Sequence, residues 1–156
     1  MFLLFLPLSI KNMFSKSCEY AIKAMIFVAQ KSKDEARVSL KEIAKGTDAP
    51  EHFIAKIMQE LGRKRLVQSI KGPNGGFYMT EKNLQTSITD IVKAIDGDKL
   101  YLDCVLGLKA CSEVNPCPVH FEYKEIKRNL IKMMDTNTIG KFNEKLDSGS
   151  FFLKNL

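Results

Sequence analysis

The pattern of hydrophobic and polar positions along the chain predicts several amphipathic helices. From Phe14 to Ala29, apolar side chains recur every three or four positions, the spacing of one helix face over residues 14–30. Similar spacing, bounded by capping residues, glycine or proline, predicts further helices over 39–46, 50–63 and 87–97 and from residues 118 and 138 onward. We therefore expect a mainly helical chain.

Two of these helices lie close enough in sequence to predict a helix-turn-helix. Ser39 and Glu42 have capping-box spacing at the start of the first helix, and Gly46 is expected to end it. Pro50 suits the first turn of the second helix. The expected inward face of that helix is Phe53, Ile54, Ile57, Met58 and Leu61. Its outward face carries donors for phosphates or base edges in a DNA major groove, namely His52, Lys56, Gln59 and Arg63. The alternative is an ordinary polar helix face.

The stretch LVQSI-KGPNGG-FYMT predicts a β-hairpin, because two β-prone runs flank a glycine-rich turn. The turn lacks the GKS/T ending of a nucleotide-binding P-loop and leads into a strand rather than a helix. A hairpin after a helix-turn-helix is the winged-helix arrangement. Lys71, near the hairpin tip, would then face the DNA backbone or minor groove.

Three more helices are predicted after the hairpin. Ser87 and Asp90 predict the start of one, with Gly97 at its end. The helix from Pro118 has the four-three spacing of a coiled-coil seam, formed by Val119, Tyr123, Ile126, Leu130 and Met133. A monomer would bury this seam against its own core, but we favour a dimer, because two-fold proteins recognise two DNA half-sites. Thr138 is expected to cap a last short helix with Ile139, Phe142 and Leu146 facing inward. The predicted fold class is therefore mainly α with a small β-hairpin, in which a winged helix-turn-helix is joined to a long C-terminal dimerisation helix.

Composition and charge narrow the possible partners. The chain has 156 residues, a net charge of +6 and a pI of about 9.1, so charge alone leaves two interpretations open, a polyanionic partner and a solvated basic surface. The first twelve residues, MFLLFLPLSIKN, are too short to span a bilayer and lack the features of a signal peptide. We expect them to be a non-essential extension, the protein to be cytoplasmic and its cysteines to be reduced or ligated.

Three of the four cysteines and one of the two histidines lie within residues 104–120. The spacing C-x6-C-x5-C-x2-H leaves four interpretations open: an iron–sulfur cluster, a zinc site, a redox thiol pair, or a loop whose cysteines are only packed. The candidate ligands are Cys104, Cys111, Cys117 and His120. No Ser/His/Asp set, paired-carboxylate motif or nucleotide fingerprint is present, so we do not expect an enzyme.

Five motifs in order resemble the IscR/NsrR-type bacterial winged-helix transcription regulators: SKSCEYAIKAM, KGPNGGFYM, ITDIVKAIDG, CPVH and TIGKF. The resemblance implies a homodimer that binds pseudo-palindromic promoter DNA, without a membrane or a small-molecule substrate. It also implies an iron–sulfur cluster, 2Fe-2S or 4Fe-4S, in several members and none in others. A zinc- or thiol-based redox protein, or a dimeric interaction adaptor, is the alternative function.

The resemblance also has implications for individual residues. It adds Ser15, Ser17 and Tyr20 to the expected DNA-binding residues and makes Glu19 the alternative to His120 as fourth cluster ligand. Three departures are visible: Lys71 replaces the usual wing arginine, Ala55 replaces a glutamate, and the first cysteine gap is one residue longer. The expected regions are an extension at 1–12, a winged-helix domain at 13–97, a cysteine-rich ligand loop at 98–120, and dimerisation and C-terminal helices at 121–156.

Overall fold

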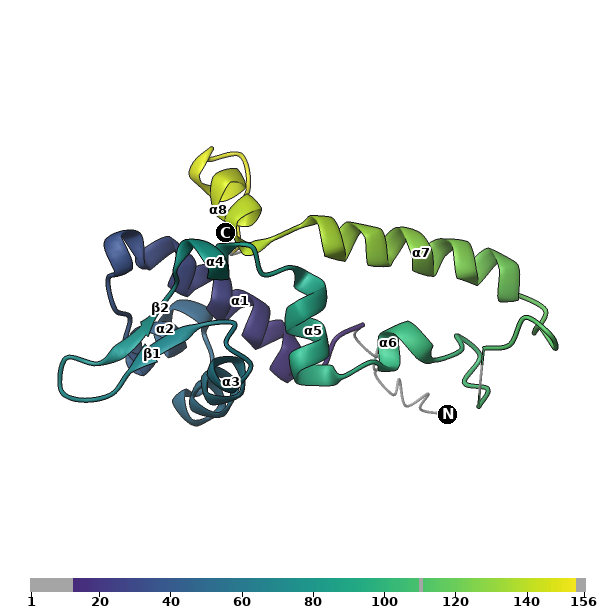
Figure 1. Cartoon of the computed structure of the whole chain (residues 1–156), viewed down its shortest axis with the longest axis horizontal. Helices are drawn as coiled ribbons and strands as arrows, with labels where there is room; N and C mark the ends of the chain where they lie inside the picture. The colour runs from purple at the N-terminus through teal and green to yellow at the C-terminus, as the bar shows by residue number, and fades with distance from the viewer. Residues whose placement is uncertain (1–12, 110, 154–156) are drawn as a thin grey trace, which may run out of the picture.

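The computed structural model describes residues 13–109 and 111–153, so the extension predicted at residues 1–12 lies outside the described residues. Figure 1 shows a helical body with a projecting β-hairpin and one long helix reaching away from it. The helices are α1 (Lys16–Lys31), the 3-10 turn η1 (Lys33–Glu35), α2 (Leu40–Thr47), α3 (Glu51–Arg63), α4 (Glu81–Leu84), α5 (Ile88–Asp96), α6 (Lys99–Leu102), α7 (His120–Thr136) and α8 (Ile139–Asp147). The strands are β1 (Gln68–Ile70) and β2 (Gly76–Tyr78).

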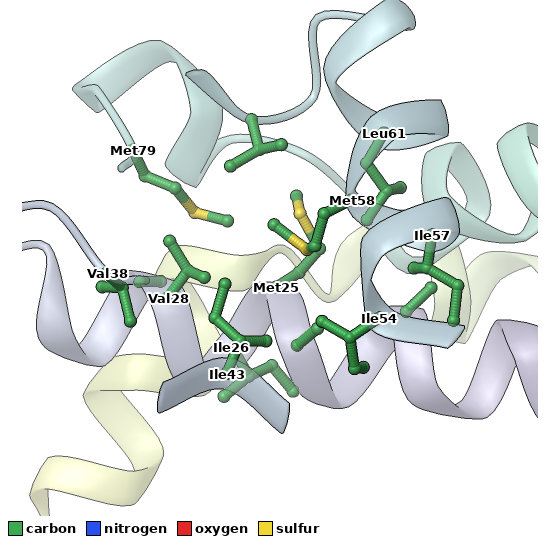
Figure 2. Close-up of a cluster of buried hydrophobic side chains, with 14 of the residues drawn as sticks. Met25, Ile26, Val28, Val38, Ile43, Ile54, Ile57, Met58, Leu61 and Met79 are labelled. Atoms are coloured by element: carbon green, nitrogen blue, oxygen red, sulfur yellow. The ribbon is translucent and has the colours of Figure 1, made fainter. Parts of the chain in front are cut away.

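Helix α1 is the centre of the main core. It contacts α2, α3, α5 and α8, and small residues such as Ala21 and Ala24, both fully buried, let these helices approach closely. Figure 2 shows the side chains that meet there, including Met25, Ile26, Val28, Ile43, Ile54, Met58 and Leu61. Burying an aliphatic side chain of this size contributes about 1.5–3 kcal/mol. This apolar cluster therefore fixes α3 relative to the rest of the domain.

The inward face predicted for α3 is correct except at one residue. Ile54, Ile57, Met58 and Leu61 are buried, but Phe53 is 45% exposed. The four buried residues follow the i, i+3, i+4, i+7 spacing of one helix face, and Phe53 falls about 100° away from Ile54 around the axis. The prediction that Phe53 faces inward is therefore wrong.

The turn between α2 and α3 also differs from the prediction. Helix α2 continues through Gly46 to Thr47, and the left-handed residue that ends it is Asp48, with φ 52° and ψ 47°. Gly46 has a different role, because a Cβ at this position would lie 2.2 Å from Cε2 of Phe27. The prediction that Gly46 ends the helix is wrong, while the capping box of Ser39 and Glu42 is confirmed.

The predicted hairpin is confirmed. Strands β1 and β2 are antiparallel, with Ser69 opposite Phe77. Val38, just before α2, adds a bridge to Phe77 through backbone hydrogen bonds of 2.8 and 2.9 Å. The hairpin is thereby attached to the segment that leads into the helix-turn-helix.

A second, smaller core joins α7 to the body. It is built from Cys18, Ile88, Val92 and Met134, with Leu130 and Ile131 of α7 packed against it. The predicted caps Ser87 of α5 and Thr138 of α8 are confirmed, and a bridge between these two residues ties the helix starts together. Helix α7 begins at His120 rather than Pro118, because Pro118 and Val119 form a turn. None of the helices in the described residues is long and apolar enough to cross a membrane.

Candidate DNA interface and cysteine loop

The predicted outward face of α3 is exposed along its whole length. His52, Lys56, Gln59 and Arg63 are all exposed, on the side of the helix away from the buried residues. Arg63 Nη1 lies 3.2 Å from Glu60 Oε2 on the preceding turn, so the charge of this arginine is partly neutralised. The face therefore offers an imidazole, an ammonium, an amide and a guanidinium to one partner surface.

Phe53 extends this face with an aromatic ring that sequence reasoning assigned to the core. Its ring centroid lies 4.7 Å from that of His52, at the start of α3. An exposed phenylalanine at the N-terminal turn of such a helix suits contact with a thymine methyl group. Its position one residue outside the buried stripe was the only signal in the sequence.

The turn of the hairpin, residues 71–75, projects beyond the body (Figure 1) and carries Lys71 in an exposed position. Gly75 at the end of the turn and Gly76 at the start of β2 are needed for close backbone approach. A Cβ at Gly75 would lie 2.3 Å from the carbonyl oxygen of Ile70, and one at Gly76, where φ is 151°, would lie 2.8 Å from that of Val38. A larger residue at either position would disturb the shape of the turn.

Ser15, Ser17 and Tyr20 lie at the N-terminal end of α1. Ser15 caps the helix by accepting a hydrogen bond from Cys18 N (3.1 Å), and its own N–H donates to Asp96 Oδ2 (2.9 Å). Ser17 is half-buried, and Tyr20 packs partly against the main core. Ser15 therefore also joins α1 to the end of α5.

The candidate ligands of the cysteine-rich segment meet in pairs. Cys111 Sγ lies 3.4 Å from His120 Nδ1, and Cys117 lies near enough to Cys104 to contribute to lowering its pKa. Within residues 13–109 and 111–153, no three His, Cys, Asp or Glu side chains are grouped closely enough to hold a metal ion. Glu19, the alternative ligand, forms an ion pair with Lys16 at 2.8 Å in the same protomer.

The surroundings of Cys104 and Cys18 have opposite effects on their thiols. Backbone hydrogen bonding with Leu106 is the largest influence that holds the pKa of Cys104 below its ordinary value, although desolvation opposes it. Burial, followed by the nearby Asp96 carboxylate, raises the pKa of Cys18 to about 12. The lowered pKa of Cys104 favours the form in which a thiol binds a metal, whereas Cys18 is a buried core residue.

The surroundings of His120 also support its assignment as a candidate metal ligand. It is buried, and its Nε2 atom has no hydrogen-bond partner among the described residues. A buried polar atom without a partner is costly, and binding to a metal is one way to satisfy it. Three thiols and this imidazole are a donor set that fits iron–sulfur or zinc ligation. The chemistry of the residues therefore fits such a group, although the described geometry brings them together only two at a time.

The ligand segment is attached to α7 through Lys127. Its ammonium donates to the carbonyl oxygens of Tyr101 (3.2 Å) and Asp103 (2.8 Å), and it lies 5.1 Å from the ring centroid of Tyr123. Asp103 directly precedes Cys104. The start of the segment is therefore held against the long helix by a charged hydrogen bond.

A helix-turn-helix followed by a β-hairpin wing, with donor side chains exposed on the second helix, defines the winged-helix class of DNA-binding proteins. Residues 14–145 match the Rrf2 family, described as an iron-dependent transcriptional regulator. The chain belongs to the Rrf2 family and is a DNA-binding transcriptional regulator.

Individual relatives agree with this assignment. A protein of Aquifex aeolicus (strain VF5) named as an HTH-type transcriptional regulator is 34% identical over 128 residues, covering 81% of this chain and 88% of that protein. The HTH-type transcriptional regulator NsrR of Geobacillus kaustophilus (strain HTA426) is 24% identical over 137 residues, covering 87% and 92%. The resemblance to the IscR/NsrR type is confirmed, and these relatives do not favour the redox-protein or adaptor alternative.

Solved structures show the same fold. CymR of B. subtilis, titled a global cysteine regulator, has a TM-score of 0.71 at 21% identity and covers 85% of this chain and 96% of its own. The structure of T. potens IscR has a TM-score of 0.68 at 17% identity and covers 90% and 92%. The predicted winged-helix fold class is confirmed. The expectation that the chain has no enzyme activity stays a prediction.

Proposed function

We propose that this regulator is a cytoplasmic homodimer that places the N-terminal half of α3 in the major groove of each half of a pseudo-palindromic promoter site. The observation that carries the proposal is the exposed face of His52, Lys56, Gln59 and Arg63, held by the buried face of the same helix. His52 is nearest the start of α3 and is assigned to base edges. Lys56 and Arg63 are assigned mainly to phosphates, and Gln59 suits either.

The wing and the start of α1 complete the proposed DNA surface. Lys71 lies in the projecting turn of the hairpin, where an ammonium attracts the phosphates that flank the major-groove site. Ser15, Ser17 and Tyr20 lie at the end of α1, a helix in direct contact with α3. The hydroxyl groups of Ser17 and Tyr20 are proposed to bind backbone phosphates, which fix the register of the protein without reading sequence. The hydroxyl of Ser15 donates to the Asp96 carboxylate, so the proposed contribution of Ser15 is to position this end of α1 on the DNA.

The dimer is proposed to form through α7. Val119, which directly precedes α7, and Ile126 and Met133 on this helix are between 37% and 64% exposed, and the helix extends away from the body (Figure 1). Exposed apolar side chains at heptad spacing on one helix favour a protein partner. Because the residues follow coiled-coil spacing, a second copy of α7 is the partner that fits best.

We further propose that Cys104, Cys111 and Cys117 hold an iron–sulfur cluster, with His120 as fourth ligand and Glu19 of the partner subunit as the alternative. The thiolate tendency of Cys104, the unpartnered Nε2 of His120 and the iron-dependent description of the family support this. When bound, such a cluster would supply a redox- and iron-sensitive group. Zinc, or no metal, is the alternative that metal analysis decides.

The first test measures DNA binding against salt. The probe is the duplex that the wild-type protein enriches most from a random library. With about 6 phosphate contacts, the log–log slope of affinity against salt should be about −5, because bound cations are released. Fluorescence anisotropy from about 50 to 200 mM salt measures the slope. A flat response would contradict the proposed DNA surface.

The second test separates recognition of bases from positioning. His52→Ala should relax the sequence enriched from a random library, since His52 is assigned to base edges. Lys71→Ala should weaken binding evenly across sequences and reduce the magnitude of the salt slope by about 2, because each protomer of the dimer loses one phosphate contact. If His52→Ala leaves the enriched sequence unchanged, the assignment of His52 to base edges is wrong.

A further inference from the structure

We propose that Arg37, which lies outside both the helix-turn-helix and the hairpin, is a DNA-contacting residue of the wing that binds a backbone phosphate beside the hairpin turn. This inference rests on the proposed placement of the wing on DNA. It adds to that surface a residue that no pattern in the sequence marked.

Arg37 is brought to the wing by backbone pairing. The neighbouring Val38 pairs with Phe77 of β2 through N–O distances of 2.8 and 2.9 Å. Gly76 allows this approach, since a Cβ there would lie 2.8 Å from the carbonyl oxygen of Val38 and 3.2 Å from Cβ of Arg37. The segment before α2 is therefore joined to the hairpin by a single β-bridge beside the two-stranded sheet.

The side chain of Arg37 then reaches the tip of the wing. Its Nη1 donates to the carbonyl oxygen of Asn74 at 2.8 Å, across 37 residues of sequence. Asn74 is part of the same exposed turn that contains Lys71. The guanidinium and the ammonium are therefore presented by one small surface, with the guanidinium fixed to the backbone of the turn.

The hydrogen bond to Asn74 leaves most of the binding capacity of the guanidinium in place. A guanidinium has five N–H donors, and a neutral carbonyl does not cancel its charge. Arg37 is exposed, and among the described residues it is in none of the ion pairs. An arginine already held in one orientation loses less side-chain entropy on binding a phosphate than a mobile lysine does.

The position of Arg37 compensates for the lysine that replaces the usual arginine of the wing at position 71. Lys71 supplies a point charge but no planar fork, whereas Arg37 supplies the fork from the adjoining segment. Because phosphates carry no sequence information, the Arg37 contact should set affinity and the position of the wing rather than the preferred sequence.

The experiment compares Arg37→Ala, Arg37→Lys and Lys132→Ala on the library-selected duplex, in fluorescence anisotropy at several salt concentrations. Arg37→Ala should bind about tenfold more weakly and reduce the magnitude of the salt slope by about 2, because the proposed dimer loses one phosphate contact in each protomer. Arg37→Lys should keep the wild-type slope with a smaller loss of affinity, because it retains the charge without the fixed orientation. Lys132→Ala, which removes one charge from α7, should leave both quantities unchanged.

The outcomes distinguish the inference from the proposed function. If wild-type binding depends strongly on salt, and Arg37→Ala has the same affinity and the same salt slope as the wild type, the Arg37 contact is overturned while the proposed DNA surface stands. Weaker binding of Arg37→Ala with an unchanged slope also overturns it, because Arg37 would then only support the turn. A flat wild-type salt response overturns both the proposed DNA surface and the Arg37 contact. Circular dichroism confirms that each variant is folded.

Discussion

At the scale of single residues, two glycines of the helix-turn-helix have opposite surroundings. Gly46 lies inside α2 against the ring of Phe27, where a Cβ would come within 2.2 Å of Cε2. Gly62 lies near the end of α3, and nothing lies within 4 Å of the position of its Cβ. The same substitution therefore meets a packed ring at one site and open space at the other.

Gly62→Ala should stabilise the protein, because alanine restricts the unfolded chain and favours the helix by about 0.5–1 kcal/mol. Gly46→Ala should instead lower the free energy of unfolding, since overpacking typically costs about 1–3 kcal/mol and exceeds the helix gain. Urea unfolding followed by circular dichroism measures both variants. Equal stabilisation by the two substitutions would show that the Phe27 ring moves aside without cost.

At the scale of elements, α7 is divided between two kinds of contact. Near its C-terminal end, Met134 is buried, and Leu130 and Ile131 pack on the second core of the same protomer. Ile126 is 64% exposed and Met133 is 49% exposed, so the described residues of the same protomer leave about half or more of each side chain uncovered. Leu130 therefore stabilises the fold of its own protomer, although the coiled-coil spacing placed it on the same predicted seam as Ile126.

Ile126→Asp should convert the proposed dimer to a monomer without unfolding it, because it places a charge on the exposed part of the seam. Light scattering measures the mass, and Lys132→Asp, at a polar position of the same helix, is the control. A Leu130→Asp change is a poor test of the dimer, since it also puts a charge against the core. An Ile126→Asp variant that stays dimeric would contradict pairing through α7.

At the scale of the whole molecule, the cysteine segment lies between the DNA-binding domain and α7. It begins after α6, which Lys127 of α7 holds by hydrogen bonds to Tyr101 and Asp103, and it ends where α7 starts at His120. If a cluster bound to Cys104, Cys111 and Cys117, it would bring these cysteines together and order the segment next to α7. A cluster changes DNA binding only if its affinity differs between two arrangements of the dimer.

Protein purified without oxygen should therefore absorb visible light and contain iron and sulfide, and its DNA affinity should change when the cluster is removed. Cys104→Ala, Cys111→Ala and Cys117→Ala should each abolish the absorption. Cys18→Ala should keep it, because Cys18 is a buried core thiol. The variant with the more labile cluster, His120→Ala or Glu19→Ala, identifies the fourth ligand. Colourless protein with stoichiometric zinc would contradict the cluster while leaving the DNA-binding regulator unaffected.

Local chemistry in the sequence was sufficient for the longer helices, the hairpin and the exposed side of α3, whereas the short helices α4 and α6 were not predicted. The capping pairs Ser39–Glu42 and Ser87–Asp90, the glycine-rich hairpin turn and the buried stripe from Ile54 to Leu61 each depend on residues within a few positions of one another. Such interactions have fixed spacings, so their residues can be recognised before the fold is known.

The tertiary structure decided what depends on residues distant in sequence. Gly46 leaves room for the Phe27 ring and does not end the helix. Leu130 packs on the core of its own protomer. Arg37 donates to Asn74 only because the neighbouring Val38 pairs with the hairpin. No local spacing encodes these contacts, since each depends on how separate elements pack. The sequence by itself determined which side chains are available to bind DNA and metal. Packing determined which of these side chains lie together. The physical reason is that an amphipathic pattern specifies which face of a helix is buried, but not which other element packs against that face.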